Sequence, residues 1–404
     1  MRKLVQKFAG ALSLAVIFIQ AVTLYAQAIL PDNYYVAAGE ALKLHTPVPI
    51  ETMQTENSLP VEAYSSPGNH YSLKLALPGG IPIKQIQVQV VDREMVIPGG
   101  NAFGIKMFTE GVIVVGLSDV SSGDTRNPAK AAGIKVGDII LTMGGRNVQS
   151  NEDVGAIVSA SKGKPLDVEL ERSGSRQTIK ICPVKSDDGV YRAGIWVRDS
   201  SAGIGTMTFY DPAAGVFAGL GHAICDIDTG SIMPLHSGEI VDVSILGVNK
   251  GASGTPGELK GTFLPKTTGE LKVNSQCGIF GTGEMPDSDA APVPLALRCE
   301  VEEGPAIIRC TLSDNKVQEF EAVIEKVSIA QDNLTKNMVI HVTDPELLEK
   351  TGGIVQGMSG SPILQNGKLV GAVTHVFVND PTRGYGIFAE NMAEMARNAG
   401  PAGK

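Results

Sequence analysis

Aromatic residues are scarce in this sequence, while glycine and proline are abundant. Aromatic side chains make up 5% of the 404 residues, against 47 glycines and 23 prolines. Such a composition favours many turns between short strands over helical bundles, and we expect a mostly β architecture. The length suggests two or three domains.

Positive charge is also in short supply, and it is not concentrated in any one stretch. The formal net charge is −9, and the Lys and Arg residues are scattered along the chain. No basic stripe is present that could follow a nucleic-acid backbone. We therefore expect no nucleic-acid partner.

Motifs for cofactors and metal ions are missing as well. The sequence contains no GxGxxG, Walker A or HExxH pattern, and its five cysteines form neither a CxxC pair nor a Cys/His cluster with zinc spacing. Nucleotide-dependent and zinc-dependent chemistry therefore have no support. We expect no cofactor and no metal site.

The N-terminus has the pattern of an export segment. Three basic residues occur before Phe8, no charged residue occurs from Phe8 to Pro31, and Leu12–Ile19 is almost entirely apolar. Ala26-Gln27-Ala28 has the small-x-small form of a cleavage site, yet the uncharged stretch is long enough to remain as a membrane anchor. Both interpretations place the rest of the chain outside the cytoplasm.

The chain divides into four predicted regions. Residues 1–28 are the signal or anchor segment, and residues 29–95 are a linker or accessory region because Pro and Gly interrupt them. Residues 96–184 and 185–404 are the two larger domains. Just before residue 96, Ile86–Val90 alternates apolar and polar residues, the period of a half-buried strand. Beyond residue 185, short β-type runs such as Met338–Val342, separated by Gly and Pro, favour a barrel or a sandwich.

Residues 96–184 resemble a PDZ domain. The resemblance depends on Phe103-Gly104-Ile105, the strand Gly111–Val115, the block Gly137-Asp138-Ile139-Ile140 and a helix from Asn151 to Ser161, with Asn151 as its N-cap. It implies that the backbone around Phe103, Gly104 and Ile105 holds the carboxylate of a peptide that binds as an added β-strand. The alternative is a compact β-rich module without a ligand.

The segment Gly357-Met358-Ser359-Gly360-Ser361-Pro362 pairs a candidate nucleophile with a backbone suited to hold an oxyanion. Glycines on both sides let the main chain turn sharply, so that the Ser359 hydroxyl stands clear while nearby amide groups face the same reacting atom. Acyl transfer needs that geometry. The alternative is a tight turn between two strands.

A serine hydroxyl needs a histidine base, and usually a carboxylate that orients this base. His222 is the first candidate, because it follows an apolar run and has small neighbours; His236 and His375 compete with it. Asp344 is the first candidate for the acid, although an Asp before Pro is also a good helix N-cap. Asp226, Asp228 and Asp242 are the alternative acids, and the first two could equally be solvated turn residues after His222.

Long segments of the chain resemble the sporulation stage IV protein B peptidases of endospore-forming bacteria. They are Val96–Gly100, Gly219–His222, Thr351–Pro362 and Gly371–Pro381. The resemblance implies a serine endopeptidase with a chymotrypsin-like β-barrel. In it Ser359 is the nucleophile, His222 the general base and Asp344 the orienting acid, and the amides near Gly357 and Ser359 stabilise the oxyanion.

The same resemblance implies a role in signalling between two compartments during sporulation. The protein would act between the forespore and mother-cell membranes, in contact with the forespore membrane. It would cleave a membrane-bound regulator of an intramembrane metalloprotease, so that a late sigma factor precursor is processed, and it would cleave itself with guidance from the PDZ domain. The alternatives are a non-catalytic PDZ adaptor and an envelope quality-control protease.

Overall fold

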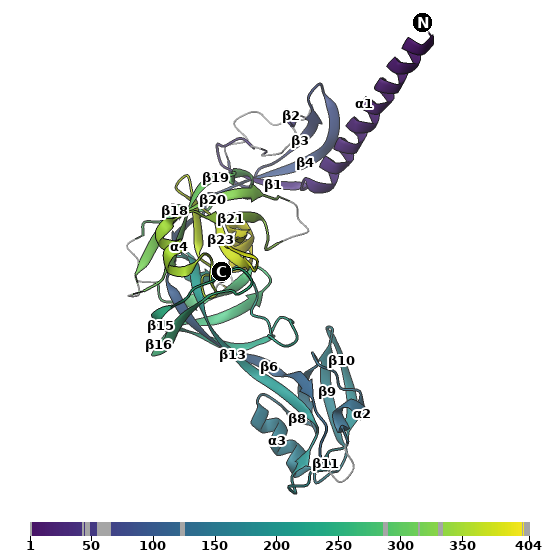
Figure 1. Ribbon diagram of the computed structural model, residues 1–404, viewed down its shortest axis with the longest axis vertical. Helices are drawn as coiled ribbons and strands as arrows, with labels where there is room; N and C mark the ends of the chain where they lie inside the picture. The colour runs from purple at the N-terminus through teal and green to yellow at the C-terminus, as the bar shows by residue number, and fades with distance from the viewer. Residues whose placement is uncertain are drawn as a thin grey trace.

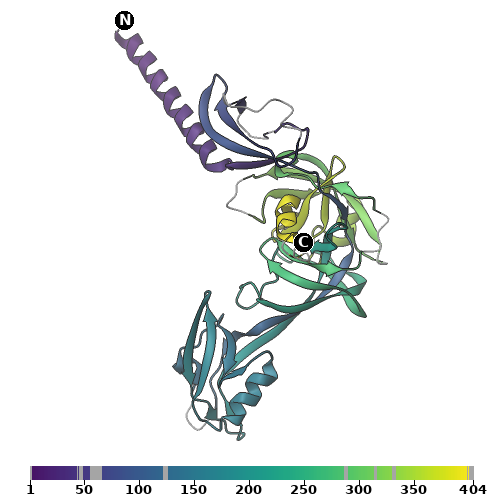
Figure 2. The same cartoon turned by 180° about the vertical axis from the view of Figure 1, so that it is seen from behind.

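The computed structural model describes residues 2–42, 44, 49–54, 66–121, 126–285, 290–313, 316–329, 334–397 and 399. A long helix and a small sheet lie at one end of the molecule, and two β-barrels occupy the middle (Figure 1). The module predicted to be a PDZ domain lies at the other end, at the tip of two long strands, as the view from behind also shows (Figure 2).

The accessory region is a folded sheet rather than a linker. Helix α1 (Arg2–Ile29) leads into four strands in the order β1 (Asn33–Ala37), β4 (Ile81–Val91), β3 (His70–Leu77) and β2 (Glu51–Gln54). The alternating apolar residues of β4 bury one face, as the sequence predicts. No helix within the described residues combines the length and the hydropathy that a membrane span requires.

The first barrel is a closed circuit of antiparallel strands. Its apolar core contains Phe103, Met207, Phe217 and Ile279. Strand β6 closes the circuit because it pairs with β15 on one side and with β13 on the other. In spatial order the strands are β6 (Ala102–Leu117), β15 (Leu235–Asn249), β16 (Glu258–Ser275), β17 (Gly278–Gly283), β14 (Val216–Gly219) and β13 (Ile195–Asp211), with β5 (Met95–Pro98) beside β13.

The second barrel is closed in the same way and is filled by Ile308, Ile324, Ile340 and Val373. Two closed antiparallel barrels confirm the predicted mostly β, chymotrypsin-like architecture. Its strands and the helices beside them are β19 (Gly304–Thr311), β20 (Val317–Val327), β21 (Met338–Val342), β24 (Asp380–Phe388), β23 (Lys368–Phe377), β22 (Pro362–Gln365), α4 (Pro345–Thr351) and α5 (Ala389–Ala396).

The PDZ module has a core of its own, which includes Val112, Ile140, Ile157 and Leu170. Its helix α3 begins at a capping box formed by Ser150 and not, as predicted, at an Asn151 cap. Besides parts of β6 and β13 it contains α2 (Pro128–Ala132), β7 (Ile139–Met143), β8 (Arg146–Asn147), α3 (Asn151–Ala160), β9 (Leu166–Arg172), β10 (Ser175–Ile181), β11 (Val184–Lys185) and β12 (Tyr191–Arg192).

The PDZ module is an insertion in the first barrel, and the predicted boundaries at residues 96 and 184 require correction. The strands β6 and β13 pair along their length, from Ala102 opposite Thr206 in the barrel to Leu117 opposite Ile195 in the PDZ module. Both strands therefore belong to both domains. Sequence reading places boundaries at turns, and a strand that continues from one core into the next contains no turn to mark the change.

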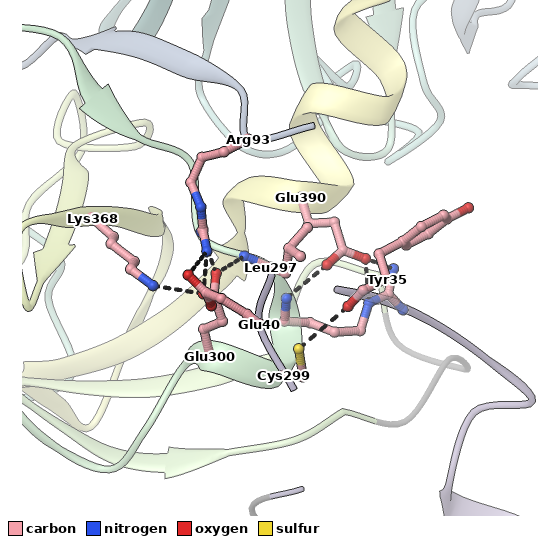
Figure 3. A network of polar contacts seen from close by, with 9 residues as sticks. Tyr35, Glu40, Arg93, Leu297, Cys299, Glu300, Lys368 and Glu390 are labelled. Atoms are coloured by element: carbon pink, nitrogen blue, oxygen red, sulfur yellow. Dashed lines mark hydrogen bonds and ion pairs between the residues drawn. The ribbon is translucent and has the colours of Figure 1, made fainter. Parts of the chain in front are cut away.

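A cluster of charged side chains joins the accessory region to the second barrel (Figure 3). The Arg93 guanidinium lies 2.6 Å from Glu40 and 2.8 Å from Glu300, and Lys368 at the start of β23 lies 2.6 Å from Glu300. Burial opposes ionisation of Glu300, but the hydrogen bonds from Arg93 and Lys368 outweigh it and lower the pKa of Glu300 to about 2. Glu300 therefore carries its charge at neutral pH.

Candidate active site

The candidate nucleophile lies in a tight loop where the two barrels meet. Gly357 and Gly360 adopt φ values of 95° and 94°, which favour glycine, on either side of Ser359. A Cβ on Gly360 would lie 2.0 Å from the carbonyl oxygen of Thr206 in the first barrel. Glycine at position 360 is therefore required for the loop to approach β13.

Strand β13 anchors this loop through three hydrogen bonds. The Thr206 amide donates to the Ser359 carbonyl at 2.9 Å, and the Thr206 hydroxyl donates to the Gly357 carbonyl at 2.7 Å. The Thr208 hydroxyl donates to the Gly360 carbonyl at 2.8 Å, and both threonines are fully buried. Peptide planes on both sides of Ser359 are thereby held against the first barrel.

Two amides of the loop remain available for an incoming oxygen atom. The Met358 amide donates to the Val355 carbonyl and the Gly360 amide donates to the Val373 carbonyl. Within the described part of the chain, the amides of Gly357 and Ser359 have no acceptor. Two unpaired amides, separated by Met358 and lying beside a serine hydroxyl, form the arrangement predicted for an oxyanion hole.

The Ser359 hydroxyl is half-buried and donates to the Thr374 carbonyl at 2.9 Å. A bulge between Val373 and His375 breaks the register of β23 with β24 at this point. Because the residue in a bulge leaves the ladder, the Thr374 carbonyl is free to accept from Ser359.

The main chain brings His222 to the same place. Leu220 and Gly221 have φ values of 65° and 68°, so the chain turns sharply after β14. A Cβ on Gly221 would lie 2.8 Å from the Thr374 methyl group. His222 and Ser359 therefore approach Thr374 from two different barrels.

The ring of His222 is held in the tautomer that a general base needs. Its Nδ1 lies 2.9 Å from the carbonyl oxygen of Ala223, so Nδ1 carries the hydrogen and Nε2 keeps its lone pair. Burial lowers the pKa of His222, although the bond to Ala223 opposes this effect. The imidazole is therefore neutral at physiological pH.

The structure does not bring the predicted acid Asp344 to His222. The Asp344 carboxylate caps helix α4, accepting from the amides of Glu346 and Leu347 at 2.9 and 3.0 Å. Its other oxygen accepts from the Glu321 amide at 3.2 Å. Helix capping, the alternative interpretation of this residue, accounts for the bonds to Glu346 and Leu347, and the third bond ties the cap to β20.

The alternative acids are not hydrogen-bonded to His222 either, and two of them, Asp226 and Asp228, pair with Arg198. Asp242 lies on β15 opposite Phe103 and faces a cavity of about 420 Å³ that Lys266 also lines. Among the described residues, no carboxylate is hydrogen-bonded to either ring nitrogen of His222. The Ala223 carbonyl occupies the position at Nδ1 that the acid of a triad would take.

The residues predicted to bind a peptide terminus belong to the first barrel. Phe103, Gly104 and Ile105 pair with β13 on one side and with β15 on the other, and the two large side chains are buried. With both edges paired, the strand has no free amide for a carboxylate and no edge for an added strand. This prediction is wrong.

No group of three His, Cys, Asp or Glu side chains in the described ranges could hold a metal ion.

His236, one of the two other histidines considered for the base, is exposed on β15. His375 is different, since its ring centroid lies 5.1 Å from that of His222.

The sequence matches the models of two known families. The sequence model of the SpoIVB peptidase S55 family matches residues 189–393, about half of the chain, and that of the PDZ domain matches residues 86–182. The chain belongs to the SpoIVB peptidase S55 family. The family is one of peptidases, and the chain carries a PDZ domain, as the sequence predicts.

Individual proteins match shorter parts of this S55 peptidase. A protein of Lactococcus lactis named as a zinc metalloprotease is 32% identical over 31% of this chain and 28% of its own, and a DegP-like periplasmic serine endoprotease of Pseudomonas fulva is 28% identical over 26% and 20%. The chain thus covers less than a third of either relative. A solved Mycobacterium tuberculosis protease aligns over 50% of this chain and 76% of its own, with 15% identity and a TM-score of 0.30.

Sequence reasoning missed the residues that hold the loop of the candidate nucleophile, Ser359. Thr206, Thr208 and Thr374 read as ordinary β-strand residues, because threonine is common in strands. Thr206 and Thr208 contact a loop about 150 residues away in the sequence, and no local pattern predicts such contacts. His375 carried a signal, since a histidine inside an apolar strand stands out.

Proposed function

We propose that this S55 peptidase is an endopeptidase in which Ser359 and His222 act as a pair. The unpaired amides of Gly357 and Ser359 beside the serine hydroxyl are the observation that carries the proposal. The hydroxyl first rotates from the Thr374 carbonyl toward Nε2 of His222. Catalytic hydrogen bonds often form only when substrate is bound.

The chemistry then follows from the protonation state of His222. As Oγ attacks the substrate carbonyl, its proton passes to Nε2, and the Ala223 carbonyl holds the imidazolium through Nδ1. The oxyanion receives hydrogen bonds from the amides of Gly357 and Ser359. The C–N bond breaks as Nε2 returns the proton to the leaving amine, and water, activated by the same nitrogen, hydrolyses the acyl-enzyme.

An open strand edge beside Ser359 supports cleavage within an extended chain. The pairing of β22 with β23 ends at Ala372, so Thr374–Phe377 have no partner strand on that side among the described residues. A substrate segment can add to this edge as a β-strand.

We further propose that the peptidase acts outside the cytoplasm in sporulation signalling. Its substrate is a membrane-bound regulator of an intramembrane metalloprotease at the forespore membrane, and it also cleaves itself. Family membership supports this role, as does the periplasmic location in the name of one relative. Helix α1 adds support, because it projects from the molecule and exposes Leu12, Leu14 and Phe18 (Figure 1).

Cleavage by the purified full-length protein tests the proposal. The substrates are the extracytoplasmic part of the regulator and an unfolded protein of unrelated sequence, each with wild type and S359A. We expect wild type to cut the regulator selectively and S359A to cut neither. Equal cleavage of the unfolded protein would indicate a quality-control protease, and binding of the regulator without cleavage by wild type would indicate an adaptor.

A further inference from the structure

The ring of a second histidine, His375, lies beside the ring of the proposed base His222. The centroids of His222 and His375 are 5.1 Å apart, and the ring planes differ by 39°. This separation lies within the range in which aromatic rings pack against each other. His375 also follows Thr374 directly, so one short piece of β23 contacts both the nucleophile and the base.

We infer that His375 is a positioning residue, whose neutral imidazole packs against the ring of His222, fixes its plane and shields it from water. The inference rests on the Ser359–His222 pair proposed above. A hydrogen bond from Nδ1 to Ala223 fixes one edge of the ring only, and the ring could still tilt about that bond. Packing by His375 removes this freedom, and it leaves Nε2 available to Ser359.

The groups around His375 keep it uncharged. Burial lowers its pKa to about 4, and the positive charges of His222 and Lys336 act in the same direction. Lys336 approaches from the segment before β21, where its Nζ lies 5.0 Å from the ring of Tyr385, the residue opposite His375 on β24. No acidic group contributes to the lowered pKa.

A neutral His375 matters because His222 must become positive during the reaction. A charged neighbour would oppose the transfer of the Ser359 proton to Nε2. The packing also keeps water from the ring, and this desolvation lowers the pKa of His222. His375 therefore affects both the turnover and the pH at which the base becomes active.

Substitutions at position 375 should move the acid limb of activity in opposite directions. The base works only when neutral, so activity falls as the pH drops through the pKa of His222. His375→Ala hydrates the ring and raises that pKa, which moves the limb to higher pH. His375→Lys adds a fixed positive charge and moves the limb to lower pH. His375→Phe keeps a neutral ring and should retain the limb of wild type.

The test is the rate at which a fluorophosphonate labels full-length protein between pH 4.5 and 9. The probe needs an activated serine and no knowledge of the substrate. We expect H375A to react about 10- to 100-fold more slowly, as misplacement of a catalytic group predicts. The acid limb should shift to higher pH in H375A and to lower pH in H375K, in each case by roughly half a pH unit or more. H375F should stay within about threefold of wild type.

The controls separate this inference from the proposed pair. His341→Ala removes a histidine of the same barrel whose ring lies 3.0 Å from Glu325. This variant should be labelled at the rate of wild type. If H222A labels like wild type, the pair itself is wrong. If H222A is inactive but H375A and H375K keep the rate and pH profile of wild type, or H375F is as slow as H375A, the inference about His375 is overturned. Should H375A fail to fold, H375K and H375F still decide.

Discussion

The hydroxyl of Ser359 donates to the main-chain carbonyl of Thr374 at 2.9 Å, and not to the ring of His222. The proposed pair therefore requires this hydroxyl to turn from the Thr374 carbonyl toward Nε2 of His222. Because the bulge of β23 turns this carbonyl toward the loop, the same strand holds the resting serine and presents the open edge for substrate. Substrate that pairs with this edge can displace the serine hydroxyl toward His222.

Thr206 should matter for catalysis although it cannot touch substrate. Thr206→Val removes the hydroxyl that donates to the Gly357 carbonyl at 2.7 Å and leaves a buried acceptor unpaired. We expect the free energy of unfolding to fall by about 1–2 kcal/mol. Because the oxyanion amides lose their support, kcat should fall about tenfold or more with little change in KM. Steady-state kinetics and thermal unfolding measure both effects.

Thr109→Val is the matched control for this prediction. Thr109 is also buried, and its hydroxyl donates to the Gly111 carbonyl at 2.6 Å. It lies on β6, where this strand passes from the first barrel into the PDZ module. This variant should lose similar stability and keep its kcat. Equal loss of kcat in both variants would show that general destabilisation, and not the anchoring of the loop, limits activity.

Asp344 should be needed for stability and not for chemistry. Serine is also a good N-cap but carries no charge, so Asp344→Ser keeps the cap of α4 and Asp344→Ala removes it. We expect D344S to be nearly as stable as wild type and D344A to lose about 1 kcal/mol. Both should retain kcat within about threefold, whereas loss of a triad acid costs about 10⁴-fold. A loss of that size in a folded D344S would establish the triad role.

The charged cluster around Glu300 should make stability depend on pH in the acidic range. The pKa of Glu300 is about 2 in the folded protein and 4.5 in the unfolded chain. The stabilisation of the fold by Glu300 is therefore present above pH 4.5 and is lost as the pH falls toward 2. Glu300→Gln should therefore lower the unfolding temperature at pH 7, and the difference from wild type should shrink below pH 4.5. Calorimetry across this range measures it.

The control for Glu300 is an ion pair of the same type at the surface. Glu346→Gln removes the exposed partner of Lys350 on α4, 2.6 Å away. Exposed pairs contribute little, so this variant should match wild type at every pH. A Glu300 variant whose deficit persists unchanged at pH 2.5 would contradict an electrostatic origin.

The PDZ module should be removable without loss of the catalytic barrels. Phe108 and Ser200 are partners in the ladder between β6 and β13, so an Asn-Gly turn can join them in place of residues 109–199. The shortened protein should fold and should label at Ser359 within about tenfold of wild type, because the catalytic loop is anchored on Thr206, beyond the cut. A folded but unreactive product would show that the PDZ module itself activates the loop.

The sequence was sufficient where the determinants of structure are local. Alternating residues predict the strand Ile86–Val90 inside β4, and the run Met338–Val342 coincides with β21. The glycines that flank Ser359 predict a sharp turn, and Gly357 and Gly360 have positive φ values. Turn geometry depends on a few neighbouring residues, so this candidate could be found from the sequence.

The sequence was insufficient where the determinants lie far apart in the chain. The resemblance at Phe103–Ile105 fits a PDZ domain, but pairing with β15, more than 130 residues later, places these residues in the barrel. Asp344 satisfies a capping pattern and a family pattern at once, and only its contacts distinguish them. Insertion of one domain into a strand pair of another leaves no local trace.

The measurement that tests the account most directly is the site of covalent labelling by a fluorophosphonate. Wild type, S359A and H222A are treated at pH 7.5, and the modified residue is identified by peptide mass spectrometry. The account predicts one adduct, on Ser359, that is absent from S359A and forms at least about 100-fold more slowly in H222A. An adduct on another residue, or labelling of H222A at the rate of wild type, would contradict it.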